Sequence, residues 1–181
     1  MSKTSAAAAK ALTSSHFALF GLVPAFALDV ERLEAAYRDI QSKVHPDRFA
    51  QAGDAERRAS MQMTIRVNEA YRVLRSPLLR AKYILELNGV DTGFETNTAM
   101  PREFLVEQME LRERLEEAKS GADLDAIARG LAAERLAIEN RIQEMIDEKR
   151  DFPCATDLVR KLMFLDRLGE EIDAAYEGLE S

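Results

Sequence analysis

The sequence predicts an all-α protein with two domains, and three observations support this prediction. The chain of 181 residues holds 8 glycines and 5 prolines, and its many alanine, leucine, glutamate and arginine residues favour helix. Apolar residues recur at helical spacing along most of the chain. Residues 1–90 carry 13 basic and 9 acidic side chains, whereas residues 91–181 carry 12 and 23. This asymmetry indicates two domains that meet differently charged partners.

The composition argues against several classes of function. A single cysteine, Cys154, rules out an intramolecular disulfide and indicates a reducing compartment. Together with His16 and His45, it is too little for structural zinc, which needs a full set of Cys and His ligands at fixed spacings. No run of roughly 18 apolar residues is present, so we expect no membrane span. The small positive charge of the first half makes no basic patch for nucleic acid.

The chain begins with a segment of low complexity, residues 1–14 (MSKTSAAAAKALTS). We expect a disordered tail there. A transit peptide for an organelle is the alternative, but such peptides are usually rich in arginine and this segment has none.

A helical hairpin is predicted for the first domain, residues 15–90. After a short helix or turn in HFALFGL, Asp29 caps a helix with one apolar face. That face comprises Val30, Leu33, Tyr37, Ile40 and Val44. The residue before a proline is pushed out of the α region, so Pro46 ends this helix near Val44. Residues 45–54 then form a loop.

A second helix of the hairpin starts near Ala55. Its apolar face comprises Met63, Val67, Ala70 and Leu74. Ser76-Pro77 ends this helix and opens a shorter one, LLRAKYILEL, which stops at Asn88-Gly89. Residues 91–100 (DTGFETNTAM) lack periodicity, so we predict a linker there.

Three further helices with short connections are predicted for the second domain, residues 101–181. Apolar stripes define each helix, and the breaks between them fall at Ser120-Gly121 and at Phe152-Pro153. The first stripe comprises Phe104, Leu111, Leu115 and Ala118. Asp123 is expected to cap the middle helix, whose stripe comprises Leu124, Ile127, Leu131, Ile138, Ile142 and Met145. The last stripe comprises Leu158, Leu162, Leu165, Ile172, Tyr176 and Leu179. Short connections of this kind predict an antiparallel three-helix bundle.

The tripeptide His45-Pro46-Asp47 lies in the loop of the hairpin and allows three interpretations. A His–Asp pair can act as a general base, but no nucleophile motif accompanies it. It can also be a plain helix terminator, since Pro, His and Asp are common in turns. The third interpretation is a rigid loop that docks onto another protein, because a proline limits the entropy lost on binding.

The flanks of the tripeptide resemble the J-domain family. AAYRDIQSKVHPDRF and, after a polar loop, VNEAYRVLRSPLLRAKYILEL are similar to that family's second helix, loop and third helix. The resemblance implies that His45, Pro46 and Asp47 stimulate ATP hydrolysis by a DnaK-class chaperone. It also implies contacts from the basic residues of the first hairpin helix, Arg38 and Lys43. Asp39 stands where that family is often basic.

The second domain narrows the resemblance. FLVEQMELRERLEE and VRKLMFLDRL look like the C-terminal domain of the HscB family, the J-type co-chaperones of iron–sulfur cluster assembly. This resemblance implies an HscA-class chaperone and the scaffold protein IscU as partners, with no catalytic activity, cofactor or metal. It further implies a monomer in the bacterial cytoplasm, with the mitochondrial matrix as the alternative location.

A helical wheel indicates a binding face on the first helix of the bundle. Opposite the Phe104 stripe, three apolar side chains share one side of the helix with three acids, and apolar clusters rimmed by charge are typical of interaction sites. The resemblance assigns scaffold binding to Leu105, Val106, Met109, Glu110, Glu113, Glu117 and, from the last helix, Phe164. Alternatively, these apolar side chains cover the bundle or contact the first domain.

Three rival functions remain at this point. A J-protein that serves another client would share the chaperone but not the scaffold. An enzyme that uses His45 and Asp47 would need a nucleophile and a substrate. A purely structural helical protein would make no use of the loop.

Overall fold

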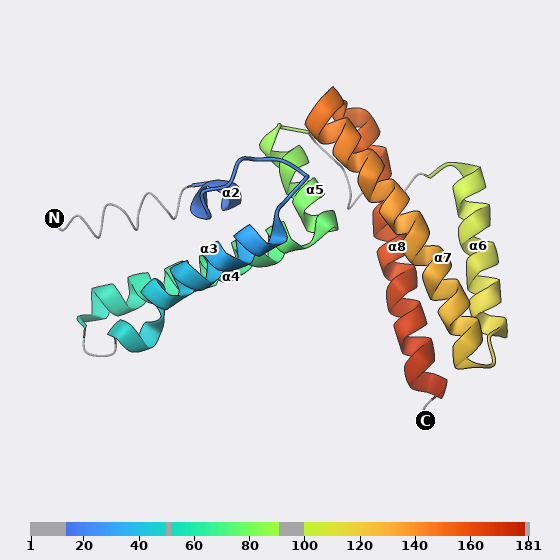
Figure 1. The fold of residues 1–181 in the computed structure, drawn as a ribbon, viewed down its shortest axis with the longest axis horizontal. Coiled ribbons are helices and arrows are strands. Elements are labelled where there is room, and N and C mark those ends of the chain that lie inside the picture. Colours follow the sequence, from blue (N-terminus) through green and yellow to red (C-terminus); the bar gives the residue numbers. More distant parts are fainter. Residues whose placement is uncertain (1–13, 50–51, 91–99, 180–181) are drawn as a thin grey trace. The chain divides into compact units, whose positions relative to one another are not determined.

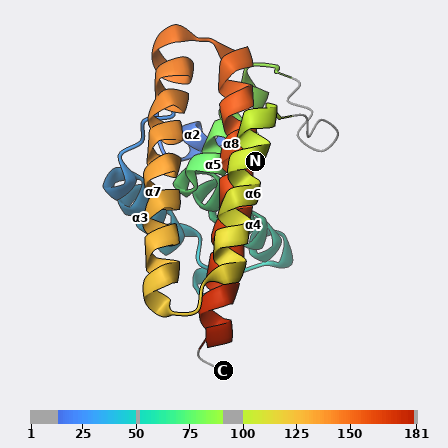
Figure 2. The ribbon, with the colours of Figure 1, turned by 90° about the vertical axis from the view of Figure 1, so that its right-hand side faces the viewer.

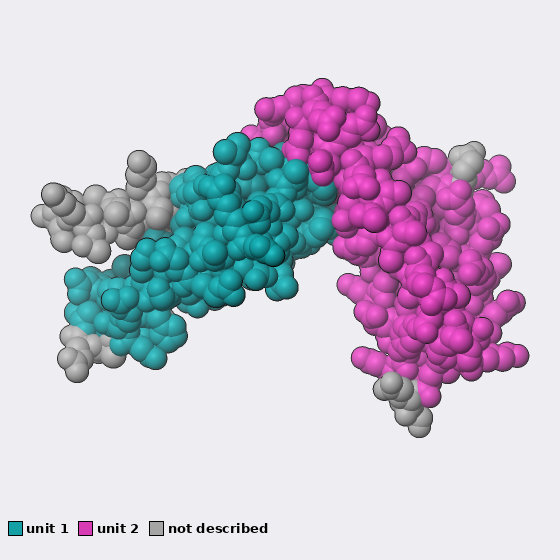
Figure 3. All heavy atoms as spheres, viewed as in Figure 1, with its two compact units in different colours: residues 1–84 teal, residues 85–181 magenta. Residues whose placement is uncertain are grey.

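The computed structural model describes residues 14–49, 52–90 and 100–179. All regular elements in these ranges are helices, as the sequence predicts (Figure 1). Apart from Ser14 and Met100, the predicted tail and linker lie outside the described residues. The chain forms two compact units, residues 1–84 and 85–181 (Figure 3). The predicted domain limits stay predictions.

A helical hairpin dominates the first unit. Helix α3 (Val30–Val44) begins where the Asp29 carboxylate accepts the Arg32 N–H at 3.0 Å, so the predicted cap is confirmed. Helix α4 (Asp54–Arg75) lies alongside it, and the two helices run side by side in Figure 1. Apolar side chains of both helices are fully buried between them and their neighbours, among them Leu33, Val67 and Leu74.

Two short helices complete the first unit. Helix α2 (His16–Leu19) buries Phe17 completely, and helix α5 (Pro77–Leu87) follows α4 directly. The ring of Tyr83 on α5 stacks on His16 with centroids 4.2 Å apart, and its hydroxyl accepts the His16 backbone N–H at 2.9 Å. These contacts fasten α2 to α5.

A polar contact network joins the hairpin helices along one edge. The rings of Tyr37 and Tyr71 stack 4.1 Å apart. The Tyr37 hydroxyl donates to Asn68 Oδ1 at 3.0 Å, and the Gln41 amide donates to the same oxygen at 2.6 Å. Because these contacts join particular residues of α3 to particular residues of α4, they stabilise one lengthwise position of α3 relative to α4.

The second unit is a three-helix bundle (Figure 2). Its helices are α6 (Arg102–Glu117), α7 (Gly121–Gln143) and α8 (Phe152–Leu179). The core lies mainly between α7 and α8 and includes Leu124, Ile127, Leu131, Ile138, Ile142, Leu158, Leu162, Leu165, Leu168 and Ile172. The predicted stripe of α7 is therefore confirmed, and so are Leu158, Leu162, Leu165 and Ile172 of the α8 stripe. Of the remaining two α8 residues, Tyr176 is half-buried and Leu179 is 47% exposed.

The start of α7 differs from the prediction. Ser120, not Asp123, is the N-cap residue, and Asp123 lies at the third helical position. The two residues form a capping box, in which the Asp123 N–H donates to Ser120 Oγ at 3.3 Å and the Ser120 N–H donates to Asp123 Oδ2 at 3.0 Å. Hydrogen bonds from the Ser120 hydroxyl and from the backbone N–H groups of Lys119 and Ser120 hold the pKa of the Asp123 carboxyl below its usual value. Such boxes pair two otherwise unsatisfied donors at a helix start.

The turn between α7 and α8 includes a wider helical segment. A π-helical turn, η2 (Glu144–Lys149), extends α7 and buries Met145 and Ile146. Arg150 then adopts the left-handed conformation with φ 56°. Asp151 caps α8 by accepting the Cys154 N–H at 3.1 Å. Among the described residues, no helix is long and apolar enough to cross a membrane.

Candidate functional site

The loop between α3 and α4 carries His45-Pro46-Asp47. Helix α3 ends at Val44, and His45 leaves the helical region with φ −56° and ψ 130°, as a residue before proline is expected to do. A 3₁₀ turn, η1 (Pro46–Phe49), follows at once. The predicted end of the helix is confirmed, and the tripeptide occupies a tight, defined turn.

The functional groups of His45 and Asp47 are exposed and close together. The Asp47 backbone N–H donates to His45 Nδ1 at 3.3 Å, and Asp47 Oδ2 lies 3.5 Å from the same nitrogen. A neutral ring that accepts at Nδ1 carries its hydrogen on Nε2. The side chain of His45 is 53% exposed and that of Asp47 is 91% exposed. Both can therefore meet a partner without rearrangement.

This geometry favours docking over acid–base catalysis. A carboxylate that orients a catalytic histidine is held by its surroundings and is often buried. The Asp47 carboxylate is almost fully exposed instead. Within the described ranges, no group of three or more His, Cys, Asp or Glu side chains could hold a metal ion.

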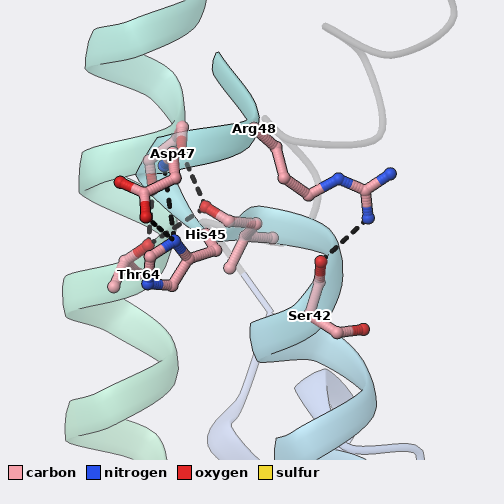
Figure 4. Close-up of polar contacts among 7 residues, drawn as sticks. Ser42, His45, Asp47, Arg48 and Thr64 are labelled. Carbon is pink, nitrogen blue, oxygen red and sulfur yellow. Dashed lines mark hydrogen bonds and ion pairs between the residues drawn. The ribbon is translucent and has the colours of Figure 1, made fainter. Parts of the chain in front are cut away.

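Side chains that the sequence analysis did not single out form hydrogen bonds to the backbone next to the loop. Arg48 Nη1 donates to the carbonyl of Ser42 at 2.8 Å, and the Ser60 hydroxyl donates to the carbonyl of Val44 at 2.7 Å. Thr64 Oγ1 lies 3.3 Å from the same Val44 carbonyl. Figure 4 shows Arg48 reaching back to Ser42 and Thr64 lying beside His45. No sequence pattern marks these contacts, because those of Ser60 and Thr64 join α4 to α3 and that of Arg48 depends on the turn η1.

The basic residues predicted for the chaperone face are separated on α3. Arg38 and Lys43 are five residues apart, which places them about 140° apart around a helix. Lys43 Nζ forms an ion pair with Asp39 Oδ2 at 2.6 Å, with both side chains more than half exposed. The structure therefore brings Lys43 together with Asp39 rather than with Arg38.

A second candidate surface lies on α6. Leu105, Val106 and Met109 are 40%, 45% and 61% exposed. The acids that were predicted beside them, Glu110, Glu113 and Glu117, are exposed as well. We call these six side chains the α6 face. Exposed apolar side chains surrounded by acids are typical of an interaction site.

Phe164, the seventh predicted scaffold residue, lies differently. It is half-buried, and its ring meets Phe104 edge to face with centroids 5.9 Å apart. Phe164 therefore supports α6 from α8 and leaves only part of its surface to a partner. The wheel placed it 120° from the core stripe of α8 but could not show that α6 covers this side.

The contact of α6 with its neighbours is unusually polar. Gln108 is buried on α6 beside Phe104 and is 1% exposed, whereas Leu111 and Leu115 are only half-buried. Arg112 binds Glu171 of α8 through two guanidinium nitrogens, at 3.0 and 3.1 Å. The sequence prediction had skipped Gln108, although it lies one helical turn after Phe104.

Charge also accumulates where α6 meets α7. Burial and the negative charge of Glu107 on α6 raise the pKa of Glu134 on α7 above its usual value, and Lys161 on α8 partly offsets this. The Lys161 ammonium also lies 5.3 Å from the ring centroid of Phe104. Lys161 of α8 therefore offsets part of the effect on Glu134 and also contacts the Phe104 ring.

Comparisons with known proteins identify relatives of the chain. A family model described as the HSCB C-terminal oligomerisation domain matches residues 100–173. A co-chaperone protein HscB homolog from Aromatoleum aromaticum is 49% identical over 173 residues, which covers 94% of this chain and 98% of the relative.

Solved structures extend the likeness to the whole fold. The chaperone HscB from Vibrio cholerae is 34% identical with a TM-score of 0.82, covering 92% of this chain and 99% of that one. The human co-chaperone HscB is 31% identical with a TM-score of 0.85, covering 90% and 82%. These structures confirm the predicted fold class, a J-domain followed by a helical bundle. The chain belongs to the HscB family of co-chaperones.

Proposed function

We propose that this protein delivers the iron–sulfur scaffold protein IscU to an HscA-class, DnaK-like chaperone and stimulates that chaperone's ATPase. The observation that carries the proposal is the pairing of two exposed surfaces on separate units of one chain. One surface is the tight loop with His45 and Asp47 exposed. The other is the apolar and acidic α6 face.

The loop suits the chaperone end of this adaptor. Pro46 leaves little loop entropy to lose on docking. The exposed Asp47 carboxylate can pair with an arginine or accept backbone N–H groups of the chaperone. The His45 ring offers a donor at Nε2 while Nδ1 is engaged with the Asp47 N–H.

The α6 face suits the scaffold end. Its apolar side chains supply area for burial, and its acids favour a partner with a complementary basic rim. Binding of the scaffold to one unit while the other docks the chaperone raises the effective concentration of the scaffold at the chaperone. The protein needs no catalytic group of its own for this role, and we place it in the bacterial cytoplasm.

Single-turnover hydrolysis by the purified chaperone tests the loop. The wild-type chain should raise the rate, whereas His45→Gln should leave it basal, because the exposed ring contributes contacts rather than fold stability. Circular dichroism of His45→Gln should match the wild type. Equal stimulation by both chains would remove the docking role.

Calorimetry with purified scaffold tests the α6 face. Met109→Ala, at the most exposed apolar position, should weaken binding by about tenfold, as truncation at an interface centre commonly does. Leu136→Ala is the matched control, because Leu136 is similarly exposed at 59% but lies on α7. A chain that stimulates the chaperone but ignores the scaffold would instead be a J-protein for another client.

The oligomeric state needs its own measurement. The matching family model is described as an oligomerisation domain, whereas we propose a monomer that binds other proteins. Light scattering after size exclusion, over a range of protein concentrations, should give a constant mass of one chain. A mass that doubles with concentration would contradict the monomer.

A further inference from the structure

The end of α3 leaves several backbone carbonyls without their helical partners, among them those of Ser42 and Val44. In an α-helix each carbonyl accepts the N–H four residues on. For Ser42 that position is Pro46, which has no N–H. For Val44 it is Arg48, whose N–H donates instead to the His45 carbonyl at 3.0 Å. Carbonyls at a helix end need substitute donors.

Two side chains supply these donors. The Arg48 guanidinium reaches the Ser42 carbonyl at 2.8 Å, and the Ser60 hydroxyl reaches the Val44 carbonyl at 2.7 Å. Arg48 is exposed, so it can also touch a partner directly. Ser60 is 6% exposed and lies on α4, 16 residues from Val44. Any effect of Ser60 on docking must therefore pass through Val44 and the loop.

Thr64 does not replace Ser60 as the donor. A hydroxyl has one hydrogen to donate. The Thr64 hydroxyl lies 3.0 Å from the carbonyl of Ser60, one turn back on α4, and 3.3 Å from that of Val44. Its hydrogen is better placed for the Ser60 carbonyl. The hydrogen bond from the Ser60 hydroxyl is consequently the stronger of the two contacts between α4 and the Val44 carbonyl.

We propose that Ser60 is a positioning residue, whose hydroxyl holds the His45-Pro46-Asp47 loop in its docking conformation through the carbonyl of Val44. This inference rests on the proposed function and deepens it. Without the hydroxyl, a smaller fraction of the molecules holds the loop in the conformation that docks. The apparent affinity for the chaperone falls in proportion to that fraction. Saturating protein restores full stimulation, because the docking groups themselves are unchanged.

A pair of isosteric substitutions isolates the hydroxyl. Ser60→Thr and Ser60→Val add nearly the same volume at this buried position, and only threonine keeps the donor. The concentration of protein that gives half-maximal stimulation of the chaperone ATPase should be higher for Ser60→Val than for Ser60→Thr, by up to about fivefold, which corresponds to the loss of about one hydrogen bond. Maximal stimulation should be equal.

A measurement without chaperone tests the order of the loop separately from the proposed function. Amide hydrogen exchange at Arg48, whose N–H is bonded within the loop, should be about fivefold faster in Ser60→Val than in Ser60→Thr. Ser42→Ala serves as the control, because its hydroxyl donates to the Asp39 carbonyl of its own helix. This control should leave both readouts at the wild-type value.

The outcomes separate the two ideas. Equal exchange and equal half-maximal concentrations for the threonine and valine chains overturn the role of Ser60. Faster exchange with unchanged chaperone titration also overturns it, because the loop order would then have no bearing on docking. A wild-type chain that fails to stimulate the chaperone overturns the proposed function instead. In that case the exchange comparison shows only whether the Ser60 hydroxyl orders the loop.

Discussion

The rings of Phe104 and Phe164 meet edge to face, with centroids 5.9 Å apart and planes at 81°. This contact joins α6 to α8 directly beneath the α6 face. Aromatic pairs in this arrangement contribute about 0.5–1.5 kcal/mol beyond the area that they bury. The helix that presents the predicted scaffold-binding residues is therefore held by an aromatic contact that includes one of those residues.

Substitution of Phe164 should consequently affect both stability and binding. We expect Phe164→Ala to lower the free energy of unfolding by about 2 kcal/mol, since a half-buried ring is lost from the bundle. Leu105→Ala, at a position that is 40% exposed, should change it by less than about 0.5 kcal/mol. Urea unfolding followed by circular dichroism measures both. An unchanged midpoint for Phe164→Ala would show that the aromatic pair does not hold α6.

Gln108 should be replaceable by a better core residue. Its side chain is 1% exposed, and neither its amide nitrogen nor its amide oxygen has a hydrogen-bond partner among the described residues. A buried polar group without a partner costs about 1–3 kcal/mol. Gln108→Leu, of similar volume, should therefore raise the free energy of unfolding by about 1 kcal/mol or more.

The control for Gln108 is an exposed glutamine in the same bundle. Gln143→Leu at the end of α7, where the side chain is exposed, should give no comparable gain. A loss of stability in Gln108→Leu would mean that the amide is satisfied after all, for example by a buried water.

Arg150 should be improved by glycine. Its φ of 56° lies in the left-handed region, which costs an L-residue about 1 kcal/mol and glycine little. Arg150→Gly should therefore stabilise the turn between α7 and α8 by about 0.5–1 kcal/mol. Glu148→Gly, inside the helical segment two residues earlier, should destabilise by a similar amount. Thermal unfolding of the two variants should shift in opposite directions.

His16 should make the first unit sensitive to mild acid. Burial and the nearby charge of Arg66 lower the pKa of the ring below its ordinary 6.5, with Glu69 partly opposing this. At mildly acidic pH, the His16 ring is therefore protonated more readily in the unfolded chain than in the folded protein. The His16 contribution is favourable above about pH 6.5 and is lost as the pH falls from there to the folded-state pKa.

Comparison with His16→Gln over pH tests this effect. The stability of the wild type relative to His16→Gln should decrease between about pH 7 and pH 5, because glutamine does not titrate. The backbone N–H of residue 16, which donates to the Tyr83 hydroxyl, is retained in the variant. A stability difference that stays constant with pH would contradict the lowered pKa.

Much of the fold could be predicted because helices are local structures. The apolar stripes of α7 and α8 and the capping role of Asp29 follow from spacing and residue type alone. The end of α3 follows from Pro46, whose ring restricts the residue before it. The start of α7 was misplaced by three residues, because a serine and an aspartate compete as caps in a capping box.

The candidate sites were predicted less completely. The exposure of Leu105, Val106 and Met109 agrees with the helical wheel, which assigns each residue an angle around its own helix. The wheel does not show which sides a neighbouring helix covers, so it gave Phe164 an outward position. Gln108 was skipped because the core stripe was drawn through apolar residues only, although its spacing from Phe104 places it on the core side. Arg38 and Lys43 were assigned to the chaperone face by the resemblance to the J-domain family, although their spacing of five residues separates them around the helix.

The sequence by itself determined where the helices form, where they stop, and that His45-Pro46-Asp47 lies in the loop of a hairpin. These features depend on interactions within a few residues. Only the tertiary structure decided that Ser60 of α4 caps the last carbonyl of α3 and that Phe164 supports α6. Both contacts join atoms of different helices, and their partners are chosen by packing, which local spacing does not encode.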